Sequence, residues 1–193
     1  MIPILILAAG QSTRMLGRDK LLEQIDGVPL LRQRALAALN ASDQVFVTLP
    51  GTDHPRHQTI HDLPVTIVAV PDAATGMAAS LRRGVATLPD CNHFMVLLAD
   101  LPEVTSADIA VMMAQINGTH LIFRGTSSDG SPGHPLIFHA ILRPLFAILT
   151  GDKGAKDIIS SHPTKLIALP GQHATRDLDT PDDWANWRKE TQR

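Results

Sequence analysis

The residues with the clearest chemical capacity are two cations that follow a glycine near the N-terminus. Arg14 and Lys20 come after an apolar run at positions 4–7 and a segment of small residues that includes Gly10. Glycine lets the backbone approach a ligand without a Cβ in the way, and neighbouring backbone N–H groups can point at phosphate oxygens. Arginine meets phosphate as a planar fork and lysine as a point charge. The pattern predicts a polyphosphate-binding loop after a buried strand.

Two better-known phosphate-binding loops do not fit this spacing. A Walker A loop that began at Gly10 would carry Gly-Lys-Ser/Thr at positions 15–17, where this chain has Met-Leu-Gly. A dinucleotide fingerprint would need glycine at the positions of Ser12 and Met15. A dinucleotide oxidoreductase is therefore only a third alternative. There is also no Gly-x-Ser-x-Gly elbow, which disfavours an α/β-hydrolase.

Asp100 is the strongest candidate for a metal ligand. It follows the apolar run at positions 93–98 and precedes a Leu-Pro pair. A carboxylate at the end of a buried strand faces the crevice in which open α/β sheets bind ligands. Mg²⁺ takes one or two protein carboxylates and completes its shell with phosphate and water. We therefore expect Asp100 to bind Mg²⁺.

Composition narrows the class of protein. The chain has 193 residues, a net charge of −2, 4% aromatic residues, no Tyr and one Cys. This length predicts one domain over residues 1–193. The charge and the scarcity of aromatics argue against a nucleic-acid partner, and one Cys excludes a disulfide framework. No basic leader and no run of eighteen apolar residues are present, so we expect a cytoplasmic protein without a membrane partner.

Apolar runs alternate with helical patterns along the chain, which predicts an α/β fold with a mostly parallel sheet between two layers of helices. Pro29 is expected at a first helical position, and Met77, with three later residues, on the buried face of a helix. Residues 125–133 are expected to form a long flexible loop, and the three histidines of the polar segment 53–62 to lie at the surface. The expected strands after the first are residues 44–49, 65–70, 93–98, 119–124, 133–138 and 165–169; the main expected helices are residues 75–88, 105–116, 141–149, 155–160 and a final one opened by Pro181.

The N-terminal stretch resembles the signature Leu-Ala-Ala-Gly-x-Ser-x-Arg-Met-Gly-x-x-Lys of nucleotidyltransferases related to the molybdenum cofactor cytidylyltransferase, with Leu16 as one extra residue. Four later segments match the same family in order. They are Gly76-Met77 with Ser80, Asp100-Leu101-Pro102, Gly133-His134-Pro135, and Asp177-Leu178-Asp179-Thr180-Pro181. The resemblance spans the chain and implies a three-layer, Rossmann-like nucleotidyltransferase domain.

The resemblance implies Mg²⁺-dependent transfer of CMP from CTP to molybdopterin, with release of pyrophosphate and a possible handover of the product to a molybdoenzyme or its chaperone. Ala9 is the hint toward CTP, because relatives that use GTP tend to carry Leu-Ala-Gly-Gly there. Which of Asp177 and Asp179 approaches the metal stays open, and both can be structural. The implied residues are Arg14, Lys20 and Asp100 for catalysis; Leu7, Ala8, Ala9, Gly10, Ser12, Thr13, Arg14, Lys20, Asp72, Gly76, Met77 and Ser80 for the nucleotide; His134 and Asp179 for the second substrate; and Asp100 and Asp177 for the metal.

Three alternatives stay beside this prediction. GTP can replace CTP as the donor. The acceptor can be another phosphorylated molecule, such as a sugar phosphate or an isoprenoid precursor. A different class is a nucleotide-binding regulatory module without catalysis.

Overall fold

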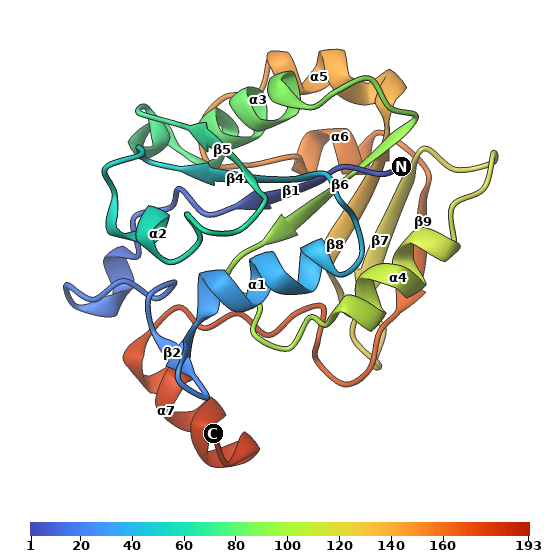
Figure 1. The fold of residues 1–193 in the computed structure, drawn as a ribbon. Helices are drawn as coiled ribbons and strands as arrows, with labels where there is room; N and C mark the ends of the chain where they lie inside the picture. Colours follow the sequence, from blue (N-terminus) through green and yellow to red (C-terminus); the bar gives the residue numbers. More distant parts are fainter.

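A seven-stranded sheet forms the centre of the computed structural model, which describes residues 1–193 (Figure 1). Its strand order is β5-β4-β1-β6-β8-β7-β9. Only β8 runs antiparallel to its neighbours β6 and β7. The predicted α/β fold with a mostly parallel sheet is therefore confirmed. The strands are β1 (Ile4–Leu7), β4 (Val45–Leu49), β5 (Thr66–Ala69), β6 (His93–Leu98), β7 (Ile122–Thr126), β8 (Pro132–His139) and β9 (Thr164–Ala168).

Helices cover both faces of this sheet, and the alternation of side chains in β1 shows the two cores. Ile4 and Ile6 belong to one apolar cluster and Leu5 to the other, since successive strand residues point to opposite faces. One face carries α1 (Leu30–Leu39), α4 (Ser106–Ala114) and α7 (Pro181–Thr191); the other carries α3 (Met77–Thr87), α5 (Arg143–Ala147) and α6 (Lys156–Ser160). The remaining elements are α2 (Pro55–Gln58), a small hairpin of β2 (Gln24–Ile25) and β3 (Val28–Pro29), and 3-10 turns at Thr13–Met15, Ala73–Thr75 and Ala140–Leu142.

Close packing brings the start of α3 to the carboxyl end of β1. Gly84 in α3 lies against Leu5, and a Cβ at this glycine would come within 2.5 Å of the Leu5 side chain. The helix therefore lies directly on the strand. Because α3 begins beside the loop after β1, the two segments form adjacent walls of one crevice.

Capping boxes hold the starts of two helices. Thr105 and Asp108 exchange side-chain and backbone hydrogen bonds at the start of α4, and Thr180 and Asp183 do so at the start of α7. The second box anchors the chain next to Asp179, so the cap also fixes a residue of the predicted site.

Four local predictions were wrong. Residues 125–133 are not a long loop, because β7 runs to Thr126 and β8 starts at Pro132. Only residues 127–131 form the turn of a tight hairpin, in which Ser127 and Ser131 pair and Asp129 bonds to both. Residues 119–121, expected to be part of a strand, precede β7. Pro29, expected to be the first residue of a helix, instead pairs within the small hairpin, so α1 begins at Leu30. Met77 is 41% exposed, because it lies at the mouth of a cavity rather than in the core.

Prolines bracket both edge strands of the sheet. Pro64 and Pro71 flank β5, and Pro163 and Pro170 flank β9. These two strands have four and five residues. In addition, no helix of the structure combines the length and the apolar character needed to span a membrane.

Candidate active site

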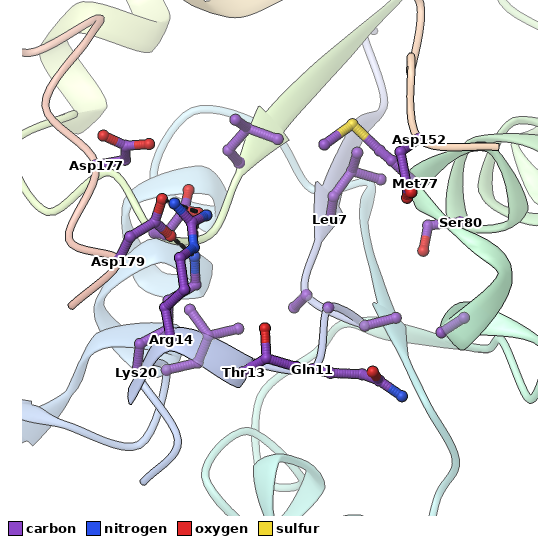
Figure 2. A pocket seen from close by; sticks show the side chains of 18 of the residues that line it. Leu7, Gln11, Thr13, Arg14, Lys20, Met77, Ser80, Asp152, Asp177 and Asp179 are labelled. Atoms are coloured by element: carbon purple, nitrogen blue, oxygen red, sulfur yellow. Dashed lines mark hydrogen bonds and ion pairs between the residues drawn. The ribbon is translucent and has the colours of Figure 1, made fainter. Parts of the chain in front are cut away.

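A cavity of about 530 Å³ lies at the carboxyl ends of β1 and β6 (Figure 2). We call it the first cavity. It brings together segments far apart in sequence: the loop after β1, the start of α3, the end of β6, and the chain near Asp152 and Asp179. Ten of the twelve predicted nucleotide-binding residues line it, namely Leu7, Ala8, Ala9, Gly10, Thr13, Arg14, Lys20, Gly76, Met77 and Ser80.

Ser12 and Asp72 are the two that do not line the first cavity. Ser12 has a left-handed backbone (φ 52°), and its hydroxyl is engaged by Arg56 and Asp19. Asp72 turns toward α3, where its carboxylate accepts a 2.7 Å bond from Arg83. Ser12 therefore faces Arg56 and Asp19 behind the loop after β1, and Asp72 lies beside α3.

The extra residue Leu16 does not disturb the reach of Lys20. Leu16 takes a left-handed turn (φ 52°) and is 85% exposed, so the additional length bulges toward solvent. Lys20 still points into the first cavity, where it meets Asp100 and Asp179.

An ionic centre in the first cavity consists of Arg14, Lys20, Asp100 and Asp179 (Figure 2). Lys20 Nζ lies 2.5 Å from Asp100 Oδ2 and 2.6 Å from Asp179 Oδ1, and Arg14 lies 2.6 Å from Asp179 Oδ2. Burial alone would lower the pKa of Lys20, but the two carboxylates outweigh it and raise this pKa. The lysine therefore stays charged and donates two of its three hydrogens to the carboxylates of Asp100 and Asp179. A bound polyanion could accept these hydrogen bonds in place of the carboxylates.

This ionic centre, in the crevice at the carboxyl ends of the strands, is suited to a nucleoside triphosphate. Residues 4–166 match the family of MobA-like NTP transferase domains. The chain belongs to this family. It is therefore a nucleotidyltransferase of the MobA-like type.

Curated relatives and solved structures are similar to this chain over nearly its whole length. The molybdenum cofactor guanylyltransferase of Serratia proteamaculans is 28% identical, with 96% of this chain and 93% of the relative covered. The probable molybdenum cofactor guanylyltransferase of Synechococcus elongatus is 27% identical, with 93% and 94% covered. The crystal structure of Rv0371c from Mycobacterium tuberculosis superposes with a TM-score of 0.84 at 28% identity and 97% coverage of both chains. Rv0371c has also been crystallised in complex with manganese, and that structure matches with a TM-score of 0.81 at 28% identity and 96% coverage of both chains.

Two carboxylates of this MobA-like NTP transferase have oxygen atoms free for a cation. Asp100 Oδ1 is buried without a hydrogen-bond partner, and Asp177 forms no ion pair. Burial raises the pKa of Asp177, and the neighbouring charges of Asp179 and Asp100 raise it further. Excess carboxylate charge of this kind suits a hard divalent cation, although no cluster of three ligands is preassembled.

Asp152 was missed as a residue of the first cavity, although its Gly-Asp-Lys-Gly context resembles a segment of the same family. Its loop is pressed against the start of α3, where the Ala78 N–H donates to the Gly151 carbonyl at 3.1 Å. Gly76 allows this approach, because its φ is 117° and a Cβ there would meet Asp152 at 2.5 Å. Only tertiary contact shows that this loop reaches the first cavity.

Arg56 is the second residue that the sequence did not reveal. It comes from α2, its side chain is 2% exposed, and it binds three parts of the loop after β1, on the side away from the first cavity. Its guanidinium donates to the Ala8 carbonyl at 2.6 Å, to the Ser12 hydroxyl at 3.1 Å and to both oxygens of Asp19 at 2.7 and 2.8 Å. One planar cation therefore fixes both ends of the loop that runs along the first cavity.

His134, predicted to contact the second substrate, does not line the first cavity but an adjoining one. Burial lowers its pKa to about 4, an effect that exceeds the opposing attraction of Asp100. Its Nδ1 is buried without a partner. The imidazole is therefore neutral at pH 7 and can serve as a hydrogen-bond partner without carrying charge.

The depressed pKa of His134 predicts acid sensitivity. Between pH 6.5 and pH 4 the unfolded chain binds a proton at this residue that the folded chain does not, so stability falls as pH falls. From pH 7 to pH 5 the wild type should lose about 2 kcal/mol more unfolding free energy than His134→Gln in urea titrations. The exposed residue His61 gives the control, and His61→Gln should behave as wild type. Equal pH slopes for all three proteins would contradict this account.

Proposed function

We propose that this MobA-like NTP transferase transfers CMP from CTP to molybdopterin and releases pyrophosphate. The observation that carries the proposal is the ionic centre, in which Lys20 links Asp100 and Asp179 at the ends of the central strands. It supports a triphosphate on the cations and a metal on the carboxylates. Residues 1–193 would act as one domain in the cytoplasm, where NTPs are available, and would hand the product to a molybdoenzyme or its chaperone.

The reaction follows from charge and position. A phosphate oxygen of the acceptor attacks the α-phosphorus of the nucleotide, a new P–O bond forms, and the bond to the bridging oxygen of the pyrophosphate breaks. Arg14 and Lys20 stabilise the negative charge that collects on the leaving pyrophosphate. Mg²⁺ or Mn²⁺ bound by Asp100 and Asp177 would supply further neutralisation of the phosphate oxygens. An acceptor phosphate is already ionised at neutral pH, so no general base is needed.

Two observations favour different bases. The relatives from Serratia proteamaculans and Synechococcus elongatus are named guanylyltransferases, which makes GTP the second candidate donor. Ala9 favours CTP. Its side chain is 1% exposed and packs with Val70 and Ala79 under the loop after β1, where a glycine would allow the loop to lie closer to these two residues. We infer that the methyl group leaves less room for the base, which favours a pyrimidine over a purine.

Ala9→Gly should therefore shift the donor preference toward GTP. Without the methyl group the loop can settle toward Val70 and Ala79, which enlarges the space for the base. The ratio of kcat/KM for CTP to that for GTP should fall by about tenfold, the usual effect of one methyl-sized contact. Ala37→Gly in α1 is a control for the general effect of an added glycine, since Ala37 packs against the other core. An unchanged ratio in Ala9→Gly would remove Ala9 as a determinant of the base.

Pyrophosphate release tests the proposed function directly. The assay compares CTP, GTP and ATP with Mg²⁺ or Mn²⁺, in the presence and absence of molybdopterin. Release that requires CTP and molybdopterin supports the proposal, whereas release with GTP replaces the donor and keeps the reaction. Release only with a sugar phosphate or an isoprenoid precursor would change the acceptor. NTP binding without release for any acceptor would favour a regulatory module, and NADH binding in place of NTP would favour an oxidoreductase.

A further inference from the structure

Two connecting segments carry the carboxylates of the first cavity. The β6–α4 segment, residues 99–105, contains Asp100, and the β9–α7 segment, residues 169–180, contains Asp177 and Asp179. Carboxylates that share a cavity repel one another. A divalent cation therefore binds two of them at low cost only where the protein already holds their segments together.

Inside the first cavity, Lys20 links the two segments, because its Nζ contacts both Asp100 and Asp179. This link is exchangeable, since a bound triphosphate would accept the same hydrogen bonds from the lysine. A backbone contact between the segments is long, with the Leu178 N–H donating to the Asp100 carbonyl at 3.3 Å. Contacts outside the cavity must therefore keep the carboxylates in place when Lys20 turns to a nucleotide.

Asp108 provides such a contact from the first turn of α4. Its side chain is buried, and a single oxygen, Oδ2, accepts three hydrogen bonds of 2.8 Å. Two come from the N–H and the hydroxyl of Thr105, and the third comes from Nδ1 of His173. Thr105 ends the β6–α4 segment, and His173 lies in the β9–α7 segment. One buried oxygen therefore joins the two segments.

Arg34 holds the β6–α4 segment from α1. Its side chain is buried, and one terminal nitrogen donates to the carbonyl of Leu101 at 3.2 Å and to that of Val104. Burial lowers the pKa of Arg34 to about 10, against the attraction of Asp108, so the guanidinium is still a cation at pH 7. A buried cation thus lies near the buried carboxylate of Asp108 and offsets its charge.

The β9–α7 segment is fixed at its other end by the cap of α7. Asp183 Oδ2 accepts hydrogen bonds from the N–H groups of Asp179 at 3.2 Å and Thr180 at 2.8 Å. Asp177 therefore lies in a stretch that is held on both sides, by Asp183 and by His173. Only the His173 side is tied to α4 and, through it, to the segment that carries Asp100.

We propose that Arg34, Asp108 and His173 form a buried network that positions Asp100 and Asp177 for a divalent cation. These three are positioning residues, because none of them lines the first cavity. The inference rests on the proposed function, since it takes the metal of that reaction as the ligand. It goes further by naming residues that act on the metal through its ligands, and it places the cost of holding like charges together in folding rather than in binding.

Binding of Mn²⁺ alone, measured by electron paramagnetic resonance, tests this network without nucleotide, acceptor or turnover. His173→Leu removes the bond to Asp108 and should raise the Kd for Mn²⁺ about tenfold, as is usual for residues that support metal ligands. His173→Asn should stay within about twofold of the wild type, because an asparagine amide can donate from nearly the position of Nδ1.

His162→Leu is the matched control. His162 is also partly buried, and its Nδ1 makes a hydrogen bond of the same length, 2.8 Å, to the Ile158 carbonyl. It precedes β9, however, and so lies at the end of the sheet away from the first cavity. This variant should keep the Mn²⁺ affinity of the wild type even if its melting temperature falls.

A double-mutant cycle tests whether His173 acts through Asp108. In an Asp108→Ala background, His173→Leu should change the Kd for Mn²⁺ by less than about twofold, because the bond is already absent. Thermal melts give the temperature at which every variant is folded, and affinities are compared there. If Asp108→Ala does not fold, the comparison of His173→Leu with His173→Asn decides the question.

The outcomes separate this inference from the proposed function. Equal Mn²⁺ affinity in the wild type and His173→Leu would overturn the network, as would equal losses in His173→Leu and His173→Asn. A wild type that binds no Mn²⁺ alone, yet releases pyrophosphate, would overturn the network and leave the proposed reaction standing. Loss of Mn²⁺ affinity in His173→Leu but not in His173→Asn, without pyrophosphate release for any acceptor, would support the network and count against the proposed function.

Discussion

Asp100→Asn should lower the rate of pyrophosphate release by about 10³-fold while the protein stays folded. The substitution keeps the shape of the side chain and removes its charge. An amide keeps only one of the two oxygens and carries no charge. Its oxygen can face either Lys20, now 2.5 Å from Oδ2, or the buried position of the unpaired Oδ1, but not both. The measurement is kcat at saturating nucleotide and metal, with a thermal melt on the same sample.

The matched control for this substitution is Asp90→Asn, an identical chemical change at an exposed carboxylate that forms no ion pair. It should leave kcat within twofold of wild type, roughly the range expected for surface changes. Full activity of Asp100→Asn would remove Asp100 from the metal site even if the transferase reaction itself is established. A second check is metal titration, because weaker activation by Mn²⁺ should accompany the loss of rate.

Arg56→Leu should destabilise the protein by about 3 kcal/mol, because removing one partner of a buried ion pair leaves the other charge unpaired. Arg56 is nearly inaccessible, and it alone joins Ala8, Ser12 and Asp19. For a chain of this length the melting temperature should fall by about 10 °C. The KM for CTP should rise as well, because the loop loses its support, whereas kcat should change less.

Arg32→Leu provides the control, since Arg32 forms a similar two-bond contact with Asp62 at the surface. Exposed pairs of this kind contribute little to stability, so the melting temperature should barely move. Arg56→Lys separates position from charge: it keeps the charge without the planar fork and should recover only part of the CTP affinity. A normal KM in Arg56→Leu, at temperatures where it is folded, would limit Arg56 to a role in folding.

The main features of the fold were predictable because they depend on local patterns. Apolar runs predicted the strands β1, β4 and β6, and Pro181 predicted the start of α7. Arg14, Lys20 and Asp100 were predictable for a related reason. Each lies in the segment that follows a buried strand, β1 for Arg14 and Lys20 and β6 for Asp100, and the ends of parallel strands meet at one edge of a sheet.

Arg56 and Asp152 could not be found in this way, because their positions depend on contacts with distant residues. Arg56 lies in a polar segment that reads as surface, and its burial results from Asp19, 37 residues earlier. The hairpin before β8 was missed for a different reason. Ser127, Asp129 and Gly130 are correct turn residues, but they do not show how many neighbours pair across the turn.

The prolines around β5 and β9 have a consequence for how copies of this protein meet. An edge strand exposes unpaired backbone groups and can recruit the edge of another molecule, which is a common route to aggregates. Pro64 and Pro71 on one edge, with Pro163 and Pro170 on the other, lack the N–H group that would extend such a ladder. Each edge therefore offers only a short stretch of four or five residues for pairing. The sheet can stay rigid under its binding site without acting as a template for intermolecular β-structure.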